Sequence, residues 1–356
     1  MRTESFLLEP LSPFRLDLTV WVLRRRPDNV VDRWDGHTYR RVVPLPAGPI
    51  EVAVTQIGLP ESPQMRVSVN AHPRHSKLRS TVTVVLERLL GLRIDLARFN
   101  RFAARQGQLR QLTRRFRGMK PPRFTTVFES VINAIASQQV TRTLGIRLLN
   151  RLAASYGAAV RAEGETAYAL PRSEELAALR PADLRRVGFS RQKGRAMVEL
   201  ANSINEGGPD LEALAKLPDA EALEHLRGLR GVGSWTAEYV MLRGLGGTHI
   251  FPRGVAGVRN NLQRYLRQAN PVADAAARRT LERWHLYGGL IYFYLLLDRL
   301  SEEGFLPTEA APPQAGAGNH VDTRQNIHKK HLDEKRIQSW GSCGVELGGG
   351  PRPRSY

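Results

Sequence analysis

The chain has 356 residues, which is more than one hydrophobic core usually fills, so a lone small module is excluded and two or three domains are expected. Apolar residues at 42% and charged residues at 24% argue against a mainly disordered, fibrous or membrane protein. The formal net charge is +19, carried by 46 arginines and seven lysines. This excess predicts a polyanionic partner, although a biased genomic composition would also raise the arginine content.

Cysteine content and the N-terminal sequence bear on the cellular compartment. The single cysteine, Cys343, cannot form an internal disulfide or supply a zinc or iron–sulfur cluster, which fits a reducing cytoplasm. Residues 1–14 contain two acids and two prolines and lack the basic-then-apolar layout of a signal peptide. No apolar run approaches the length of a membrane helix, the nearest being Leu290–Leu297. We therefore expect a soluble, cytoplasmic protein with no membrane partner.

Residues 1–95 predict a small α+β domain. Alternating or β-branched-rich segments predict four strands, over Phe14–Val22, Thr38–Val43, Ile50–Ile57 and Gln64–Val69. Pro, Gly, Asp and Asn separate these segments, as is typical of the turns of an antiparallel sheet. Apolar residues at helical spacing over Ser80–Leu90 predict a helix that covers one face of the sheet.

Residues 96–307 predict an all-helical domain. Its segments carry apolar residues at three- and four-residue spacing: Phe128–Ile135, Leu144–Tyr156, Glu174–Leu179, Lys193–Ile204, Asp219–Leu226, Trp235–Leu245, Gly257–Leu266, Ala273–Trp284 and Leu290–Leu300. Beyond this domain, residues 308–356 are linker-like and have little to bury, so we expect a disordered tail. The three histidines of the tail lack a metal-ligand spacing, and no metal site is predicted from side chains.

The most informative stretch is a helical hairpin over Leu226–Val240. A helix that ends near Leu226, a turn through 231–233 and a second helix that starts at Ser234 would form it. Glycine at both Gly231 and Gly233 permits positive φ and close approach of another backbone. Ser234 can cap the second helix, whose free N–H groups then face outward as a site for an anion such as phosphate. The alternative is an ordinary helix–helix turn with glycines for packing.

The order of motifs around this hairpin resembles a known family. Residues 229–239, Leu-x-Gly-Val-Gly-x-Trp-Thr-Ala-Glu-Tyr, resemble the hairpin of the helix-hairpin-helix DNA glycosylases, in the alkyl-base branch typified by bacterial DNA-3-methyladenine glycosylase II. Residues 128–141 resemble that family's helix and wedge loop, 188–193 its next turn into a helix, and 284–293 its last motif. The resemblance covers residues 5–306 and implies that the N-terminal sheet is the family's TBP-like domain.

The resemblance implies a base-excision-repair enzyme that flips alkylated purines out of duplex DNA and hydrolyses the N-glycosidic bond. It places Gln139 at the wedge, although a capping or loop-stabilising amide is an equal alternative. It makes Trp235 and Tyr287 the aromatic walls of the base pocket, which suit a cationic purine through cation–π attraction. Without the resemblance, aromatic residues on helices would more often belong to the hydrophobic core. It assigns phosphate binding to the hairpin residues Gly231, Val232, Gly233, Ser234 and Thr236.

A long basic segment lies beside these motifs. No acidic residue occurs between Asp95 and Glu129, whereas nine cations do: Arg98, Arg101, Arg105, Arg110, Arg114, Arg115, Arg117, Lys120 and Arg123. Such a run is usually a solvated face, but beside a phosphate-binding hairpin it predicts affinity for double-stranded DNA without sequence preference. We expect a monomer, nucleoid-associated if bacterial, with no cofactor except the monovalent cation that the resemblance allows on hairpin backbone carbonyls.

The family's catalytic acid is absent from its expected position. Members that resemble this chain carry one Asp in a Phe-Pro-x-Gly-Asp-x-Gly turn, and the ungapped segment Phe251–Gly257 has Val255 there. Valine cannot stabilise the positive charge that develops on the sugar, a loss that commonly costs about a hundred-fold or more in rate. Trp235 stands where bifunctional relatives place a Schiff-base lysine. No catalytic residue is therefore assigned.

Two interpretations of this replacement remain open. One is a weakened glycosylase that acts on bases already activated by positive charge. The other is a catalytically inactive DNA- or lesion-binding protein on the same fold. A basic helical scaffold for protein partners leaves the order of the motifs unexplained.

Overall fold

The computed structural model describes residues 2–71, 77–162, 164–252, 265 and 282–306. All the described residues belong to a single compact unit. The tail predicted over 308–356 lies outside the described residues, and the domain boundary expected at residue 95 stays a prediction. None of the described helices is long and apolar enough to cross a membrane.

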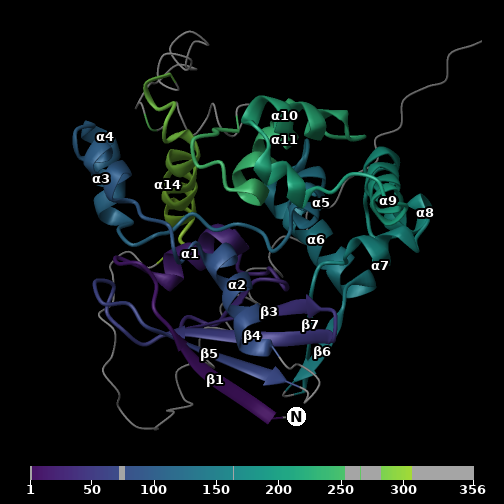
Figure 1. The fold of residues 1–356 in the computed structure, drawn as a ribbon, viewed down its shortest axis with the longest axis horizontal. Coiled ribbons are helices and arrows are strands. Elements are labelled where there is room, and N and C mark those ends of the chain that lie inside the picture. Colours follow the sequence, from purple (N-terminus) through teal and green to yellow (C-terminus); the bar gives the residue numbers. More distant parts are fainter. Residues whose placement is uncertain (1, 72–76, 163, 253–264, 266–281, 307–356) are drawn as a thin grey trace, which may run out of the picture. The chain divides into compact units, whose positions relative to one another are not determined.

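A five-stranded antiparallel sheet forms the N-terminal part, with strand order β1-β5-β4-β3-β2 (Figure 1). The strands are β1 (Arg2–Leu8), β2 (Arg33–Trp34), β3 (Thr38–Leu45), β4 (Gly48–Gln56) and β5 (Met65–Ala71). The predicted strands within 38–69 are thereby confirmed. Strand β1 was not predicted, and it pairs with β5 in a register that sets Phe6 opposite Val67.

The strand predicted over Phe14–Val22 is wrong, because this segment forms helix α1 (Leu16–Arg24). Its apolar residues alternate only at the start and then run without interruption, and nearly every residue of the helix is buried. An apolar run that is buried on most sides carries no period that separates helix from strand. The helix ends at Arg25, which has φ +58° and donates its backbone N–H to the carbonyl of Trp21 at 2.9 Å.

Helix α2 (Leu78–Leu90) covers one face of the sheet, as its spacing predicts. Its residues Val82, Leu86 and Leu89 share one hydrophobic cluster with Val54 of β4 and Val67 of β5. The 3.6-residue period of the helix thus meets the two-residue period of the strands in a common core.

The remaining part is mainly helical. Its helices are α3 (Ala97–Ala104), α4 (Gly107–Arg115), α5 (Val127–Ser137), α6 (Arg142–Tyr156), α7 (Ser173–Ala177), α8 (Pro181–Arg186), α9 (Arg191–Asn205), η1 (Glu212–Lys216), α10 (Asp219–Gly228), α11 (Ser234–Val240), the π-helical η2 (Met241–Leu245) and α14 (Gly288–Glu302). A short hairpin, β6 (Ala159–Ala162) and β7 (Glu165–Tyr168), interrupts the region predicted to be all-helical. The helices predicted over 257–266 and 273–284 fall almost wholly outside the described residues.

A buried ion network joins the sheet to helix α5. Arg41 of β3 is 3% exposed and donates through Nη1 to Asp32 Oδ1 at 2.5 Å and through Nη2 to Glu129 Oε1 of α5 at 2.5 Å. Tyr39 donates its hydroxyl to the same Asp32 oxygen at 2.7 Å. Burial by itself lowers the pKa of Arg41, but the two carboxylates raise it well above its usual range, so the guanidinium stays charged.

We predict that Glu129→Gln lowers the free energy of unfolding by about 3 kcal/mol or more, because removal of one partner leaves Arg41 buried with reduced compensation. Chemical denaturation followed by circular dichroism measures the change. The control is Glu199→Gln, which removes two surface pairs, with Arg195 and with Arg230, and should cost no more than about 1 kcal/mol. Similar losses in both variants would contradict a special role for the buried network.

Candidate nucleic-acid interface

The predicted hairpin is present, formed by α10, a turn over 229–233 and α11. Gly231 has φ +77°, and a Cβ at this position would lie 2.7 Å from the Cβ of Ala196 in α9, so both conformation and space require glycine. Gly233 has an ordinary φ of −86°, and a Cβ there would meet no atom within 4 Å. The positive φ that glycine permits is therefore used at Gly231 and not at Gly233, whose open surroundings leave room for another backbone.

The N-terminal cap of α11 differs from the prediction. Gly233 is the N-cap, no side chain caps the helix, and Ser234 is the first helical residue. Gly233 adopts the cap conformation without a side-chain hydrogen bond. Ser234 is therefore the first residue of the helix and not its cap. Gly231, Gly233 and Ser234 are exposed, whereas the side chains of Val232 and Thr236 are buried. These last two residues therefore present no side chain to a phosphate.

The wedge loop lies between α5 and α6, over residues 138–141. Gln139 is exposed and has φ +51°, in the left-handed region that is costly for a non-glycine residue. A strained, exposed residue at the tip between two helices is where a side chain could enter a base stack, so Gln139 is suitably placed for the predicted wedge role. That role stays a prediction.

The loop-stabilising amide belongs to the neighbouring Gln138, which the sequence did not single out. Its Nε2 donates to the carbonyl of Gly231 in the hairpin at 2.7 Å and to Oγ1 of the buried Thr236 at 2.8 Å. The side chain of Gln138 thus ties the wedge loop to the turn and to the first turn of α11. Because Gln138 and Gln139 are adjacent, the sequence alone does not indicate which of the two amides points inward.

Lys193, in the first turn of α9, holds the same loop from another side. Its Nζ donates to the carbonyl of Ala136 at 3.2 Å and to that of Gln138 at 2.7 Å. These carbonyls lie at the C-terminal end of α5, where a cation is favoured by the helix dipole. Burial lowers the pKa of Lys193 from its usual value. We refer to Gln138 and Lys193 together as the loop clamp.

The two predicted pocket aromatics have separate neighbours. Trp235 is half-buried, with its ring 5.4 Å from that of Tyr239 on the same helix. Tyr287, also half-buried, packs against Phe99 at 5.5 Å and Phe102 at 4.9 Å in α3. The two rings belong to different hydrophobic clusters, and their joint role as pocket walls stays a prediction.

Two buried arginines, Arg25 and Arg243, were not anticipated from the sequence. Arg25 donates to the Tyr239 hydroxyl at 3.2 Å and to Asn133 Oδ1 at 2.8 Å. Arg243 is 1% exposed, and its guanidinium carbon lies 4.7 Å from the centre of the Phe124 ring. Burial lowers the pKa of Arg243. These cations support the core next to the hairpin and are not available to solvent.

The basic segment divides into surface and structural cations. Seven side chains are exposed: Arg98, Arg101, Arg105, Arg110, Arg114, Arg115 and Arg117. Lys120 is buried and donates to the carbonyl of Ile94 at 2.7 Å, and Arg123 donates to that of Gly244 at 2.7 Å. Figure 1 shows α3 and α4 on the other side of α14 from α10 and α11. The exposed arginines therefore form a surface separate from the hairpin.

Position 255, where the family's catalytic Asp is expected, lies outside the described residues, as does Asp274. The last described residues before it, Phe251 and Pro252, are buried, and the Phe251 ring meets that of Tyr292 in α14 edge-on at 6.1 Å. In the described part of the chain, no group of three His, Cys, Asp or Glu side chains could hold a metal ion.

Residues 132–290 match the family described as "HhH-GPD superfamily base excision DNA repair protein". We refer to this matched segment as the HhH-GPD domain. This domain contains the wedge loop, the loop clamp, the hairpin and position 255.

Curated relatives and solved structures extend the match. The chain is 24% identical to the DNA-3-methyladenine glycosylase of Bacillus subtilis over 247 residues, covering 68% of this chain and 81% of the relative. It is 29% identical to DNA-3-methyladenine glycosylase 2 of Escherichia coli over 195 residues, covering 54% and 64%. Another B. subtilis relative is 25% identical over 170 residues, which cover 48% of this chain and 58% of that relative.

The similarity to one solved structure covers both the sheet and the HhH-GPD domain. The 3-methyladenine DNA glycosylase of Archaeoglobus fulgidus has a TM-score of 0.71 and 26% identity, covering 83% of this chain and 99% of that one. An 8-oxoguanine glycosylase/lyase from Clostridium acetobutylicum in complex with DNA has a TM-score of 0.65 at 18% identity, covers 84% and 98%, and bears on the fold alone. The expected fold, an antiparallel sheet followed by a helix-hairpin-helix glycosylase domain, is confirmed.

We predict that Gln138→Ala loosens the wedge loop of the HhH-GPD domain, because it removes two hydrogen bonds of about 1 kcal/mol each. Amide hydrogen exchange over residues 138–141 should accelerate about fivefold or more, with the free energy of global unfolding lowered by no more than about 3 kcal/mol. The matched control is Gln192→Ala, an exposed glutamine one residue before Lys193. Unchanged exchange over 138–141 would show that Gln138 does not hold the loop.

Proposed function

We propose that this chain is a base-excision DNA glycosylase of the 3-methyladenine type, which flips an alkylated purine out of duplex DNA and hydrolyses its N-glycosidic bond. The observation that carries the proposal is the junction at Gln138, which holds the wedge loop and the hairpin of the HhH-GPD domain as one unit. The similarity to relatives named as 3-methyladenine glycosylases favours an enzyme over an inactive binding protein.

DNA binding would use the hairpin and the exposed arginines. The uncapped backbone N–H groups at the start of α11 can donate to a phosphate, and the open space around Gly233 allows the DNA backbone to approach. Solved relatives of this fold are described in complex with DNA. We propose sequence-independent binding by a monomer, because phosphate contacts supply affinity without base readout.

Extraction of the base would place Gln139 in the gap and the base against an aromatic ring. The left-handed backbone at Gln139 presents its side chain from a loop that the clamp fixes on two sides. The half-buried Trp235 offers a π-face at the start of α11, which suits a cationic alkylated purine. Stacking of a flipped base on an aromatic ring contributes about 1–3 kcal/mol, which offsets part of the free energy needed to unstack the base from the duplex.

Catalysis would be limited by Val255. When the glycosidic bond breaks, positive charge develops on the sugar, and valine offers no charge to stabilise it. A base that carries a positive charge leaves without prior protonation, so it depends less on the missing group. We therefore propose slow release of cationic alkylated purines and essentially none of neutral bases.

We propose a reaction without a resident cofactor, since hydrolysis needs only water and electrostatic stabilisation. The resemblance allows a monovalent cation on the hairpin carbonyls, but three of these carbonyls already accept hydrogen bonds. The carbonyl of Leu229 accepts from Val232 N at 3.1 Å, that of Gly231 from Gln138 Nε2 at 2.7 Å, and that of Gly233 from Ala237 N at 2.9 Å. No step of the reaction is assigned to such an ion.

We predict that Gly233→Asp weakens binding to undamaged duplex about tenfold or more, because it sets a carboxylate beside the phosphate site. Fluorescence anisotropy at several salt concentrations measures the affinity, which should fall steeply with salt in the wild type. Gly233→Ala is the control, since its Cβ enters open space without charge. Equal affinities for the wild type and the aspartate variant would contradict phosphate binding by the hairpin.

We predict that Val255→Asp raises the single-turnover release of alkylated purines from methylated duplex by about a hundred-fold or more, the scale of one well-placed transition-state charge. Duplex affinity should change little. Val255→Asn, of similar size to Asp but uncharged, should give a much smaller gain. Rapid wild-type release that is indifferent to residue 255 would mean that another acid, such as Glu238 or Asp274, carries the reaction.

A further inference from the structure

Helices α3 and α4 each have one buried face and one arginine-rich face. The buried faces carry Phe99 in α3 and Leu109 in α4, which belong to the same hydrophobic cluster. No acidic residue occurs between Asp95 and Glu129, so the exposed faces hold only neutral and basic side chains. We call the following five exposed side chains, spaced three or four residues apart within each helix, the arginine face: Arg98, Arg101, Arg105, Arg110 and Arg114.

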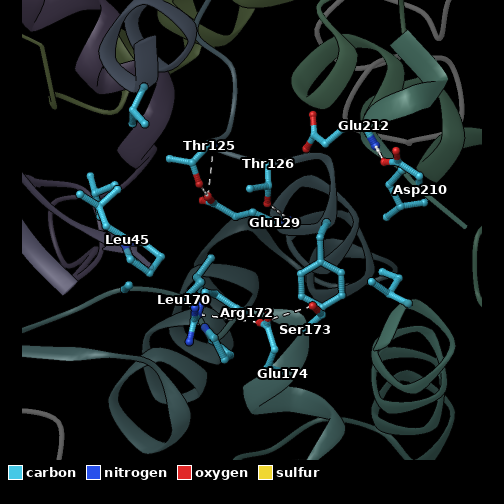
Figure 2. A pocket seen from close by; sticks show the side chains of 18 of the residues that line it. Leu45, Thr125, Thr126, Glu129, Leu170, Arg172, Ser173, Glu174, Asp210 and Glu212 are labelled. Carbon is cyan, nitrogen blue, oxygen red and sulfur yellow. Dashed lines mark hydrogen bonds and ion pairs between the residues drawn. The ribbon is translucent and has the colours of Figure 1, made fainter. Parts of the chain in front are cut away.

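The arginine face is not neutralised by acids. In the part of the chain that the structure describes, none of its five side chains forms an ion pair or a hydrogen bond. By contrast, Arg172 lies 3.9 Å from Glu174 in the wall of a cavity of about 360 Å³ (Figure 2), and Arg195 lies 2.6 Å from Glu199 on α9. Five unpaired charges of one sign repel each other, so an external anion would be attracted to this face.

Helix α14 lies between the arginine face and the hairpin (Figure 1). Its C-terminal half contacts α4 on one side, through Asp298 and Arg115, and the start of α6 beside the wedge loop on the other, through Glu303 and Arg142. Three acids are matched by three arginines along this strip: Asp298, Glu302 and Glu303 against Arg115, Arg142 and Arg299. The strip has no excess positive charge, so the two basic surfaces do not form one continuous track for a duplex.

The chemistry of the arginine face fits the phosphates of duplex DNA. A guanidinium group donates two parallel hydrogen bonds to one phosphate. Duplex DNA carries one negative charge per about 1.7 Å of its axis, so several arginines on one face can each find a phosphate. The described residues of α3 and α4 expose no large apolar side chain, so nothing on this face would insert into a lipid surface.

We propose that the arginine face binds a second segment of double-stranded DNA while the hairpin holds the first, so that one chain joins two duplexes. The inference rests on the proposed function only for the first duplex. The arginine face is the weaker site, because it offers flexible side chains and none of the fixed backbone N–H groups of the hairpin. A chain that holds two segments can pass from one to the other without release into solution.

Sedimentation velocity at low salt, with an excess of a fluorescent undamaged duplex of about 15 base pairs, counts the duplexes on each chain. Such a duplex is roughly 50 Å long at 3.4 Å per base pair. The wild type should form a complex of one chain with two duplexes, and added salt should remove the weaker duplex first. A wild-type complex that never exceeds one duplex per chain, whether it contains one chain or two, would overturn the proposal.

Replacement of the whole arginine face locates the second site. The variant Arg98→Gln/Arg101→Gln/Arg105→Gln/Arg110→Gln/Arg114→Gln should hold one duplex per chain, with the second binding constant lowered about tenfold or more. The matched control removes five exposed arginines elsewhere and should hold two duplexes: Arg66→Gln/Arg79→Gln/Arg161→Gln/Arg180→Gln/Arg185→Gln. Equal losses in the two variants would assign the second duplex to net charge and overturn the assignment to this face.

The variant Gly233→Asp separates this inference from the proposed function. It should lose the duplex on the hairpin and keep the one on the arginine face, so it also holds one duplex per chain. If Gly233→Asp holds two duplexes and the arginine-face variant one, the hairpin assignment fails and the arginine face is supported. If the arginine-face variant holds two duplexes, this inference fails and the proposed function stands.

Discussion

The buried ion pair between Arg41 of β3 and Glu129 fixes the helix that carries the wedge loop at its other end. Helix α5 is anchored to the sheet by this pair at its first turn and by the clamp of Gln138 and Lys193 beyond its last. A charge buried without its partner is costly, so the sheet and the helix cannot separate without a large loss. The position of the wedge loop therefore depends on a contact at the opposite end of helix α5.

The arginines that produce the net charge of +19 have different roles. Exposed arginines on α3 and α4 can meet phosphate, but Arg25, Arg41 and Arg243 are buried and hold the core together. Arg25 and Arg243 lie against aromatic rings and backbone or amide oxygens next to the hairpin, where they stiffen the base of α11. Composition predicted an anionic partner, yet it could not say which cations face solvent.

Most of the fold could be predicted from the sequence, because its strands and helices have clear periods and the hairpin has a specific motif. Helix α1 was missed since its continuous apolar run fits a buried helix or strand equally well. Strand β1 depends on pairing with β5, more than 50 residues away along the chain. The inward amide of Gln138 and the shift of the α11 cap to Gly233 depend on three-dimensional contacts. Val255, by contrast, can be read only from the sequence.

The central claim, that duplex DNA is opened by the wedge loop and held by the hairpin, is tested most directly by a crystal structure of the chain with a duplex that carries a stable abasic-site analogue. The account predicts Gln139 inserted into the base stack, a phosphate against the backbone N–H groups of residues 233–236, and α5, α9 and α11 joined by the clamp as in the free chain. A duplex bound along α3 and α4 alone, with Gln139 in solvent and the hairpin unoccupied, would contradict it.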